Sequence, residues 1–236
     1  MPQSVTSLPQ RKGIELKVRM DRTAEVSHNP GQIRSFVAIE LPEEAKKGLA
    51  RLRKELEKDE HRFVKWVDPG GIHLTLKFLG NIPSGRVTEI TGAMKRAVEG
   101  ICPFCLEISG LGVFPNLKQV RVLWVGVGGE LDRLSRLQQN VDSALAALGF
   151  PKEERPFVPH LTLARIREGT SAPDKKGFGE LVGSATFEDK YPVEVEAIKL
   201  MRSQLRPAGA IYTCLSLVEL TRQEGPKEIQ EDLIYR

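Results

Sequence analysis

Residues 72–79 read Ile-His-Leu-Thr-Leu-Lys-Phe-Leu, and residues 159–165 read Pro-His-Leu-Thr-Leu-Ala-Arg. Both stretches alternate apolar and polar side chains, which is the period of a β-strand with one buried face. One face of the first strand is expected to carry Ile72, Leu74, Leu76 and Phe78. Its other face is expected to carry His73, Thr75 and Lys77. The shared tetrapeptide His-Leu-Thr-Leu therefore presents a histidine and a threonine together on one side of each strand.

The two tetrapeptides occupy matching places in a longer repeat. A predicted strand and a predicted helix precede each histidine, with 37 residues from Phe36 to His73 and 37 from Leu123 to His160. Such repetition indicates two copies of one supersecondary unit. The sequence thus predicts an α+β fold with two pseudo-symmetric lobes. Each lobe is expected to be an antiparallel sheet with helices on its outer face, and an active-site groove is expected between the lobes.

The apolar patterns place the remaining elements. Strands are expected at 34–41, 63–67, 72–79, 104–109, 120–127, 159–165, 193–201 and 211–220. Helices are expected at 43–58, 84–99 and 131–148. The glycine-rich segment 168–190 reads as a long loop with one helical turn at most.

Three parts of the chain are expected. Residues 1–32 are aperiodic and read as a partly disordered N-terminal extension, and residues 221–236 read as a charged tail. Residues 33–220 form the bilobal domain, with pseudo-repeats at about 33–115 and 116–220.

Composition places only broad bounds on function. Lys plus Arg total 35 against 31 Asp plus Glu, so the net charge of +4 fits an anionic partner without demanding one. No apolar run reaches the roughly 18 residues of a membrane span, and residues 1–4 lack the apolar core of a secretory signal. Three cysteines without a disulfide framework suit a reducing compartment, and Cys102 and Cys105 read as ordinary thiols. We expect a cytoplasmic monomer that makes no contact with membranes.

The two histidines suit phosphodiester chemistry. Near neutral pH one imidazole can be neutral and accept a proton from water, while the other is protonated and gives its proton to a leaving oxygen. Thr75 and Thr162 can donate hydrogen bonds to phosphate oxygens. Neither motif contains a third metal ligand, and no nucleophile elbow or phosphate-cradling loop is present. The sequence therefore predicts an enzyme without metal or other cofactor.

With its two His-Leu-Thr-Leu motifs the chain resembles the 2H phosphoesterases, and more closely the RNA 2′,3′-cyclic phosphodiesterases, also called 2′-5′ RNA ligases. The stretches that match are Arg34–Pro42, Ile72–Gly80, Gly110–Pro115, Arg121–Val127 and Arg155–Arg165. The resemblance implies His73 as the general acid and His160 as the general base, with Thr75 and Thr162 completing a catalytic quartet. It also implies a 2′-phosphate product, reversible 2′-5′ ligation, and RNA with a cyclic phosphate end, such as tRNA fragments, as the partner.

The resemblance further implies substrate-binding residues. Arg165 is expected to contact phosphate, with an ordinary surface arginine as the alternative. Phe114 is the candidate for base stacking, and Arg121 and Tyr212 could line the groove. Phe78 is expected in the core. Val158 departs from the family pattern, where a basic residue is common.

Two other functions remain open from the sequence. One is hydrolysis of a small cyclic nucleotide such as ADP-ribose cyclic phosphate, which the modest net charge allows. The other is an RNA-binding module in which catalysis is incidental.

Overall fold

The computed structural model describes residues 31–58, 61–206 and 209–221. The predicted N-terminal extension as far as residue 30 and the predicted charged tail from residue 222 lie outside the described residues. No helix among the described residues is long and apolar enough to cross a membrane.

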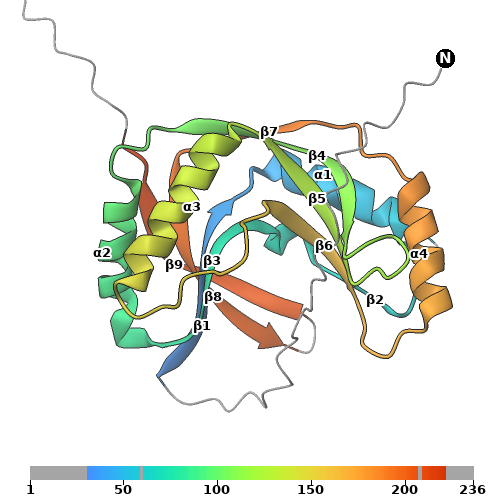
Figure 1. The fold of residues 1–236 in the computed structure, drawn as a ribbon, viewed down its shortest axis with the longest axis horizontal. Helices are drawn as coiled ribbons and strands as arrows, with labels where there is room; N and C mark the ends of the chain where they lie inside the picture. The colour runs from blue at the N-terminus through green and yellow to red at the C-terminus, as the bar shows by residue number, and fades with distance from the viewer. Residues whose placement is uncertain (1–30, 59–60, 207–208, 222–236) are drawn as a thin grey trace, which may run out of the picture.

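Two antiparallel sheets form the framework (Figure 1). The first sheet has the strand order β3 (His73–Pro83), β1 (Gln32–Glu40), β8 (Ala197–Arg206), β9 (Gly209–Glu219). The second sheet has the order β2 (Val64–Trp66), β6 (His160–Ile166), β5 (Val122–Gly129), β4 (Phe104–Phe114), β7 (Tyr191–Val195). Every strand pairing in both sheets is antiparallel.

Four α-helices of the described residues accompany the two sheets. α2 (Val87–Val98) and α3 (Leu131–Ala146) pack together beside the first sheet, whereas α1 (Glu43–Leu56) and α4 (Ala172–Ser184) lie beside the second (Figure 1). The apolar positions of α1 that the sequence predicts to be buried, Ala45, Leu49, Leu52 and Leu56, are all in the core. The predicted α+β class with two antiparallel sheets is confirmed.

Each sheet takes strands from both halves of the chain. The half that contains His73 supplies β1 and β3 to the first sheet but β2 and β4 to the second. The half that contains His160 supplies β5, β6 and β7 to the second sheet but β8 and β9 to the first. The two sheets share one local strand order, which is β3-β1-β8 in the first and β6-β5-β4 in the second. In each case the strand with the histidine pairs with the first strand of its own half, and that strand pairs with one from the other half.

A β-bulge lies at the last residue of both copies of the tetrapeptide. In β3, Val37 pairs with Lys77 and the next residue, Ala38, pairs with Thr75, so Leu76 is an extra residue. In β6, Leu163 is the extra residue between the partners of Leu123 and Trp124. A bulge shifts the alternation of side chains by one position. The fifth residue after each histidine therefore returns to the face that carries the histidine and threonine.

This bulge corrects two expectations for the first strand. Phe78 does not lie in the core: it is 68% exposed. Lys77 does not share the histidine face: it is only 7% exposed and forms an ion pair with Asp142 of α3. Both expectations assume an uninterrupted period of two along the strand, and the extra residue Leu76 breaks that period.

The segment 168–190 contains a helix where the sequence predicts a loop. The side-chain oxygen of Ser171 caps α4 by accepting a hydrogen bond from the backbone N of Asp174 at 3.2 Å. Phe178 and Val182 bury its apolar side. Glycines give this segment the composition of a loop, but one of them is needed for packing. A Cβ atom on Gly179 would lie 1.8 Å from the backbone oxygen of Leu117.

We expect opposite effects from alanine at two neighbouring glycines of α4. Gly179→Ala should lower the free energy of unfolding by about 1–3 kcal/mol, because backbone must move to admit the methyl group. Gly177→Ala should raise it by about 0.5–1 kcal/mol, since nothing lies within 4 Å of its added Cβ atom and alanine favours helix. Urea denaturation of both variants measures the difference. Equal effects would contradict the packing of Leu117 on α4.

The single strand expected over 193–201 is in fact two strands that belong to different sheets. β7 pairs with β4, and β8 pairs with β1 and β9. The chain crosses from one sheet to the other at Glu196, whose carbonyl accepts a hydrogen bond from the backbone N of Leu220 at 2.7 Å. β4 is also longer than expected, because it continues past a bulge at Gly110 as far as Phe114.

Candidate active site

His73 is the first residue of β3 and is held on two sides. Its Nδ1 lies 2.8 Å from the carbonyl oxygen of Gly71. Its ring stacks on Phe36 of β1, with centroids 4.4 Å apart and planes inclined by 21°. Tyr212 of β9 meets the same ring edge-on at 5.0 Å. These contacts fix both the position and the rotation of the imidazole.

His160 is the first residue of β6 and is held in a corresponding way. Its Nδ1 lies 2.7 Å from the carbonyl oxygen of Val158, again the residue two positions earlier. Phe114 of β4 meets the His160 ring edge-on at 5.2 Å. Because the contact uses the backbone of Val158, this interaction does not depend on the residue type at position 158.

These two hydrogen bonds fix the tautomer of both rings. A carbonyl oxygen can only accept, so Nδ1 of each histidine must carry a hydrogen and donate it. The proton that each ring gains or loses is therefore on Nε2. Each half of the protein thus presents one imidazole nitrogen that can act as a base when neutral or as an acid when protonated.

Burial lowers the pKa of His73, and its hydrogen bond to the Gly71 carbonyl opposes that change. The neutral ring is thereby favoured in the free protein, because a charged group loses hydration when it is buried. A bound phosphate anion would act in the opposite direction and favour the protonated ring.

The two threonines lie on the same face of their strands as the histidines. Across the strand pairing, Thr75 is opposite Ala38 of β1 and Thr162 is opposite Trp124 of β5. Both threonines are partly exposed. No hydrogen bond joins either hydroxyl to another residue of the described chain, so both can donate to a ligand. We call the face of each sheet that carries its histidine and threonine the inner face.

Arg165 and Tyr212 belong to different sheets, and the charge of Arg165 acts on the Tyr212 hydroxyl. Arg165 lies on β6 at the fifth position after His160, where the bulge returns it to the inner face. Burial raises the pKa of the Tyr212 hydroxyl, and the positive charges of Arg165 and Arg34 oppose that rise. The ring of Tyr212 lies over the 3₁₀ turn Pro69–Gly71, since a Cβ atom on Gly71 would come within 2.9 Å of it. Tyr212 therefore packs on the His73 side of the site, against both the His73 ring and the turn before it.

The other two candidates lie in different surroundings. Phe114 packs against both His160 and Trp124, with its centroid 5.3 Å from that of Trp124. Arg121 is exposed at the entrance to β5, beside a depression of about 360 Å³. Its backbone oxygen accepts a hydrogen bond from the N of Ile166, the residue after Arg165. Arg121 thus lies beyond the Arg165 end of β6.

Three aromatic residues beside the site were not predicted from the sequence. Phe36 lies under the His73 ring, and exposed Phe78 lies 6.1 Å from Phe36. Trp124 fills the inner face of the second sheet, where Gly112 leaves room for its indole. The indole Nε1 is buried without a hydrogen-bond partner. The register between paired strands brings these residues to the site. Such a register cannot be inferred from the alternation of side chains along one strand.

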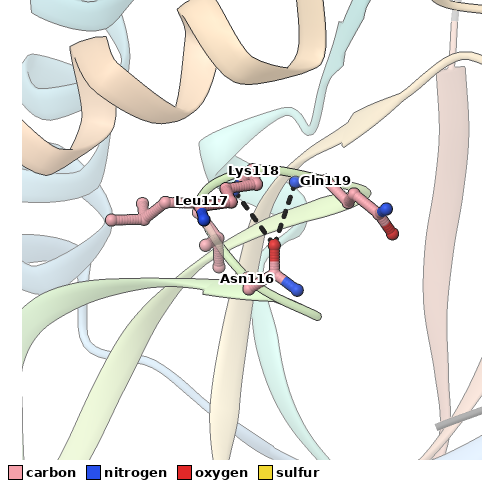
Figure 2. A pocket seen from close by; sticks show the side chains of 5 residues that line it. Asn116, Leu117, Lys118 and Gln119 are labelled. Atoms are coloured by element: carbon pink, nitrogen blue, oxygen red, sulfur yellow. Dashed lines mark hydrogen bonds between the residues drawn. The ribbon is translucent and has the colours of Figure 1, made fainter. Parts of the chain in front are cut away.

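One hollow of the described structure has no histidine in its lining. It measures about 610 Å³ and is lined by Val113 and the turn Asn116–Gln119. Figure 2 shows the amide oxygen of Asn116 accepting hydrogen bonds from the backbone N of Lys118 and of Gln119, at 3.0 and 3.1 Å. The hollow contains no histidine, and Lys118 is its only ionisable side chain, so we assign it no acid–base role.

Metal ligands do not gather among the described residues. No group of three or more His, Cys, Asp or Glu side chains in that part of the chain could hold an ion. The expectation of a metal-free reaction therefore stays a prediction that requires a chelator experiment.

Comparison with known proteins agrees with this architecture. A family model described as LigT like Phosphoesterase matches the chain twice, over residues 39–124 and 125–212. This double match agrees with the two strands that each carry a His and a Thr, one in each sheet. Together they define a phosphoesterase of the two-histidine class. The chain belongs to the LigT-like phosphoesterase family.

Several relatives are similar over most of their length. The RNA 2′,3′-cyclic phosphodiesterase of Methanothermobacter thermautotrophicus is 35% identical over 189 residues, covering 80% of this chain and 100% of the relative. The protein of the same description from Thermotoga maritima is 35% identical over 183 residues, covering 78% of this chain and 93% of the relative.

Solved structures have the same fold. A crystal structure of a Thermus thermophilus protein matches with a TM-score of 0.63 and 29% identity, covering 80% of this chain and 98% of that one. Escherichia coli LigT complexed with 3′-AMP matches with a TM-score of 0.63 and 25% identity, covering 81% of this chain and 99% of that one.

Proposed function

We propose that this protein hydrolyses the 2′,3′-cyclic phosphate at an RNA end to a 2′-phosphate, without a metal ion, using His73 and His160. The observation that carries the proposal is the matched pair of Nδ1–carbonyl hydrogen bonds at Gly71 and Val158. They leave one reactive Nε2 on each half of the site, which is the arrangement that a one-acid, one-base reaction needs. The descriptions of the relatives as RNA 2′,3′-cyclic phosphodiesterases support the choice of substrate.

The reaction balances with two proton transfers. Nε2 of neutral His160 takes a proton from water while the water oxygen bonds to phosphorus. The bond from phosphorus to the 3′ oxygen breaks, and that oxygen takes the proton of Nε2 on protonated His73. Thr75 and Thr162 donate hydrogen bonds to the non-bridging oxygens, where negative charge grows in the transition state.

The same roles allow 2′-5′ ligation. If the 5′-hydroxyl of a second RNA replaces water as the nucleophile, His160 removes its proton and His73 again protonates the departing 3′ oxygen. The product is a 2′-5′ phosphodiester. In the reverse reaction the 3′-hydroxyl attacks the same phosphorus, the 5′ oxygen leaves, and the two histidines exchange their acid and base roles. RNA fragments with cyclic ends, such as tRNA halves, are the substrate class that both reactions share.

One assay tests the proposal directly. The purified protein is incubated with EDTA and an oligoribonucleotide that ends in a 2′,3′-cyclic phosphate, and the product end is analysed. We expect opening to a 2′-phosphate with EDTA present. Opening that requires an added metal, or no opening at all, would contradict the proposal. Activity on ADP-ribose cyclic phosphate but not on RNA would favour a small cyclic nucleotide as the substrate.

The pH dependence is expected to be bell-shaped in kcat/KM, since one ring must be neutral and the other protonated. Burial lowers the pKa of His73, so one of the two limbs should fall below the ordinary histidine value of about 6.5. The residual activity of His73→Ala then assigns the roles. It should rise with pH if His160 is the base and fall with pH if His160 is the acid. A flat profile between pH 5 and 8 for the unaltered protein would exclude acid–base catalysis by the histidines.

A further inference from the structure

A polar row crosses the inner face of the first sheet beyond the aromatic residues. Arg34 of β1 is directly opposite Asn81 of β3 on one side and opposite Ser203 of β8 on the other. Ser203 is in turn opposite Tyr212 of β9. Residues that face each other across strands share a face of the sheet. Arg34 therefore lies on the same face as Phe36 and Tyr212.

The position of Arg34 differs from that of the predicted catalytic residues. Arg34 is four positions before Ala38, the partner of Thr75, which corresponds to about 13 Å along a strand. A group on Arg34 thus lies beyond the phosphate that Thr75 would contact. Tyr212 lies between, because its ring meets the His73 ring at 5.0 Å and its strand position is opposite Ser203, the partner of Arg34.

The charges of Arg34 and Arg165 are not neutralised by a described carboxylate. Helix cations such as Arg53 and Arg86 have ion pairs with glutamates of their own helices or turns. By contrast, no ion pair joins Arg34 or Arg165 to a carboxylate of the described chain, and both side chains are exposed. The unpaired guanidinium group of Arg34, in one cross-strand row with Ser203 and Tyr212, suits an anion with several oxygens.

We propose that Arg34, together with Asn81, Ser203 and the Tyr212 hydroxyl, binds the phosphodiester on the 5′ side of the terminal nucleotide. This subsite rests on the proposed function, and it makes the protein prefer RNA chains to single nucleoside cyclic phosphates. A mononucleotide has no phosphate to place there.

The length dependence of the reaction tests the subsite. We compare uridine 2′,3′-cyclic phosphate with a hexaribonucleotide that ends in the same group. Arg34→Gln should lower kcat/KM on the hexamer about tenfold, the size of one charge-assisted contact, and leave the mononucleotide within about twofold. Arg202→Gln is the matched control, because Arg202 is opposite Ser35, which is buried on the other face of the sheet. Arg202→Gln should leave kcat/KM unchanged for both substrates.

Binding gives a readout that does not require turnover. The affinity for a fluorescent hexamer with a 2′-phosphate end is measured against salt concentration. Arg34→Gln should reduce the slope of log K against log salt by about 0.7, the value for one phosphate contact on a single strand. Equal losses on both substrates, or an unchanged slope, would overturn the subsite. If the unaltered protein opens neither substrate, the proposed function fails, while the salt slope still decides whether Arg34 contacts RNA.

Discussion

Alanine at His160 is expected to lower kcat/KM for a cyclic phosphate end by about 10²–10⁴-fold, the contribution typical of a positioned acid or base. Alanine at His73 should lower kcat/KM by a factor in the same range. Both variants should keep their melting temperature within a few degrees, since each ring is held at the surface of its sheet by one hydrogen bond and by ring contacts. Initial rates on the oligoribonucleotide and a thermal melt measure the two effects.

His61→Ala is the control for both changes. His61 packs against Phe63 and Phe178 beside α4, with ring centroids 5.1 and 5.4 Å away. His61→Ala should keep kcat/KM within about threefold of the unaltered protein, because the His61 side chain is not part of either inner face. If His73→Ala or His160→Ala retained activity as high as this control, the two-histidine mechanism would be wrong.

Lys77→Met should destabilise the protein by about 3 kcal/mol, because it leaves a buried carboxylate without its partner. The ammonium group of Lys77 binds the carboxylate of Asp142 and donates to the carbonyl oxygen of Pro151 at 2.6 Å. Asp142 also accepts a hydrogen bond from the backbone N of Glu153 at 3.3 Å. These bonds connect the strand of His73 to the segment that leads to His160. Urea denaturation measures the loss.

A second substitution separates the lost charge pair from lost packing. In Lys77→Met/Asp142→Leu neither charge is present, so the double variant should recover most of the stability that Lys77→Met loses. A double variant less stable than the single one would contradict the explanation of the loss by an unpaired carboxylate. A single variant as stable as the unaltered protein would contradict the buried ion pair.

The parts of the fold that the sequence predicts well are those with an unbroken period. α1 and α3 bury the stripes that a period of 3.6 residues requires, including Leu49 and Leu137. Prediction fails where the period is interrupted. Because Leu76 is an extra residue, Phe78 and Lys77 lie on the opposite faces from those that the alternation predicts. The glycines of α4 give it the composition of a loop, although Gly179 is needed for close packing of the helix.

The candidate site was only partly predictable for a related reason. The histidines and threonines were visible because their tetrapeptide repeats in one linear pattern. Phe36, Trp124 and Arg34 come to the site through pairing between strands far apart in the chain, as in the pairing of Arg34 with Ser203. Register between such strands depends on bulges and on which sheet each strand joins, and neither can be read from one strand alone.

The exchange of strands between the halves also governs when the site can be completed during synthesis. β8 and β9 emerge from the ribosome after every other strand, yet they finish the sheet that β1 starts. Until residue 197 is available, β1 has one unpaired edge, and a nascent chain with such an edge is prone to association. Ser203 and Tyr212 are the last residues of the polar row to be made. A chain that is terminated before β8 would therefore carry both histidines but would lack Tyr212, which contacts the His73 ring.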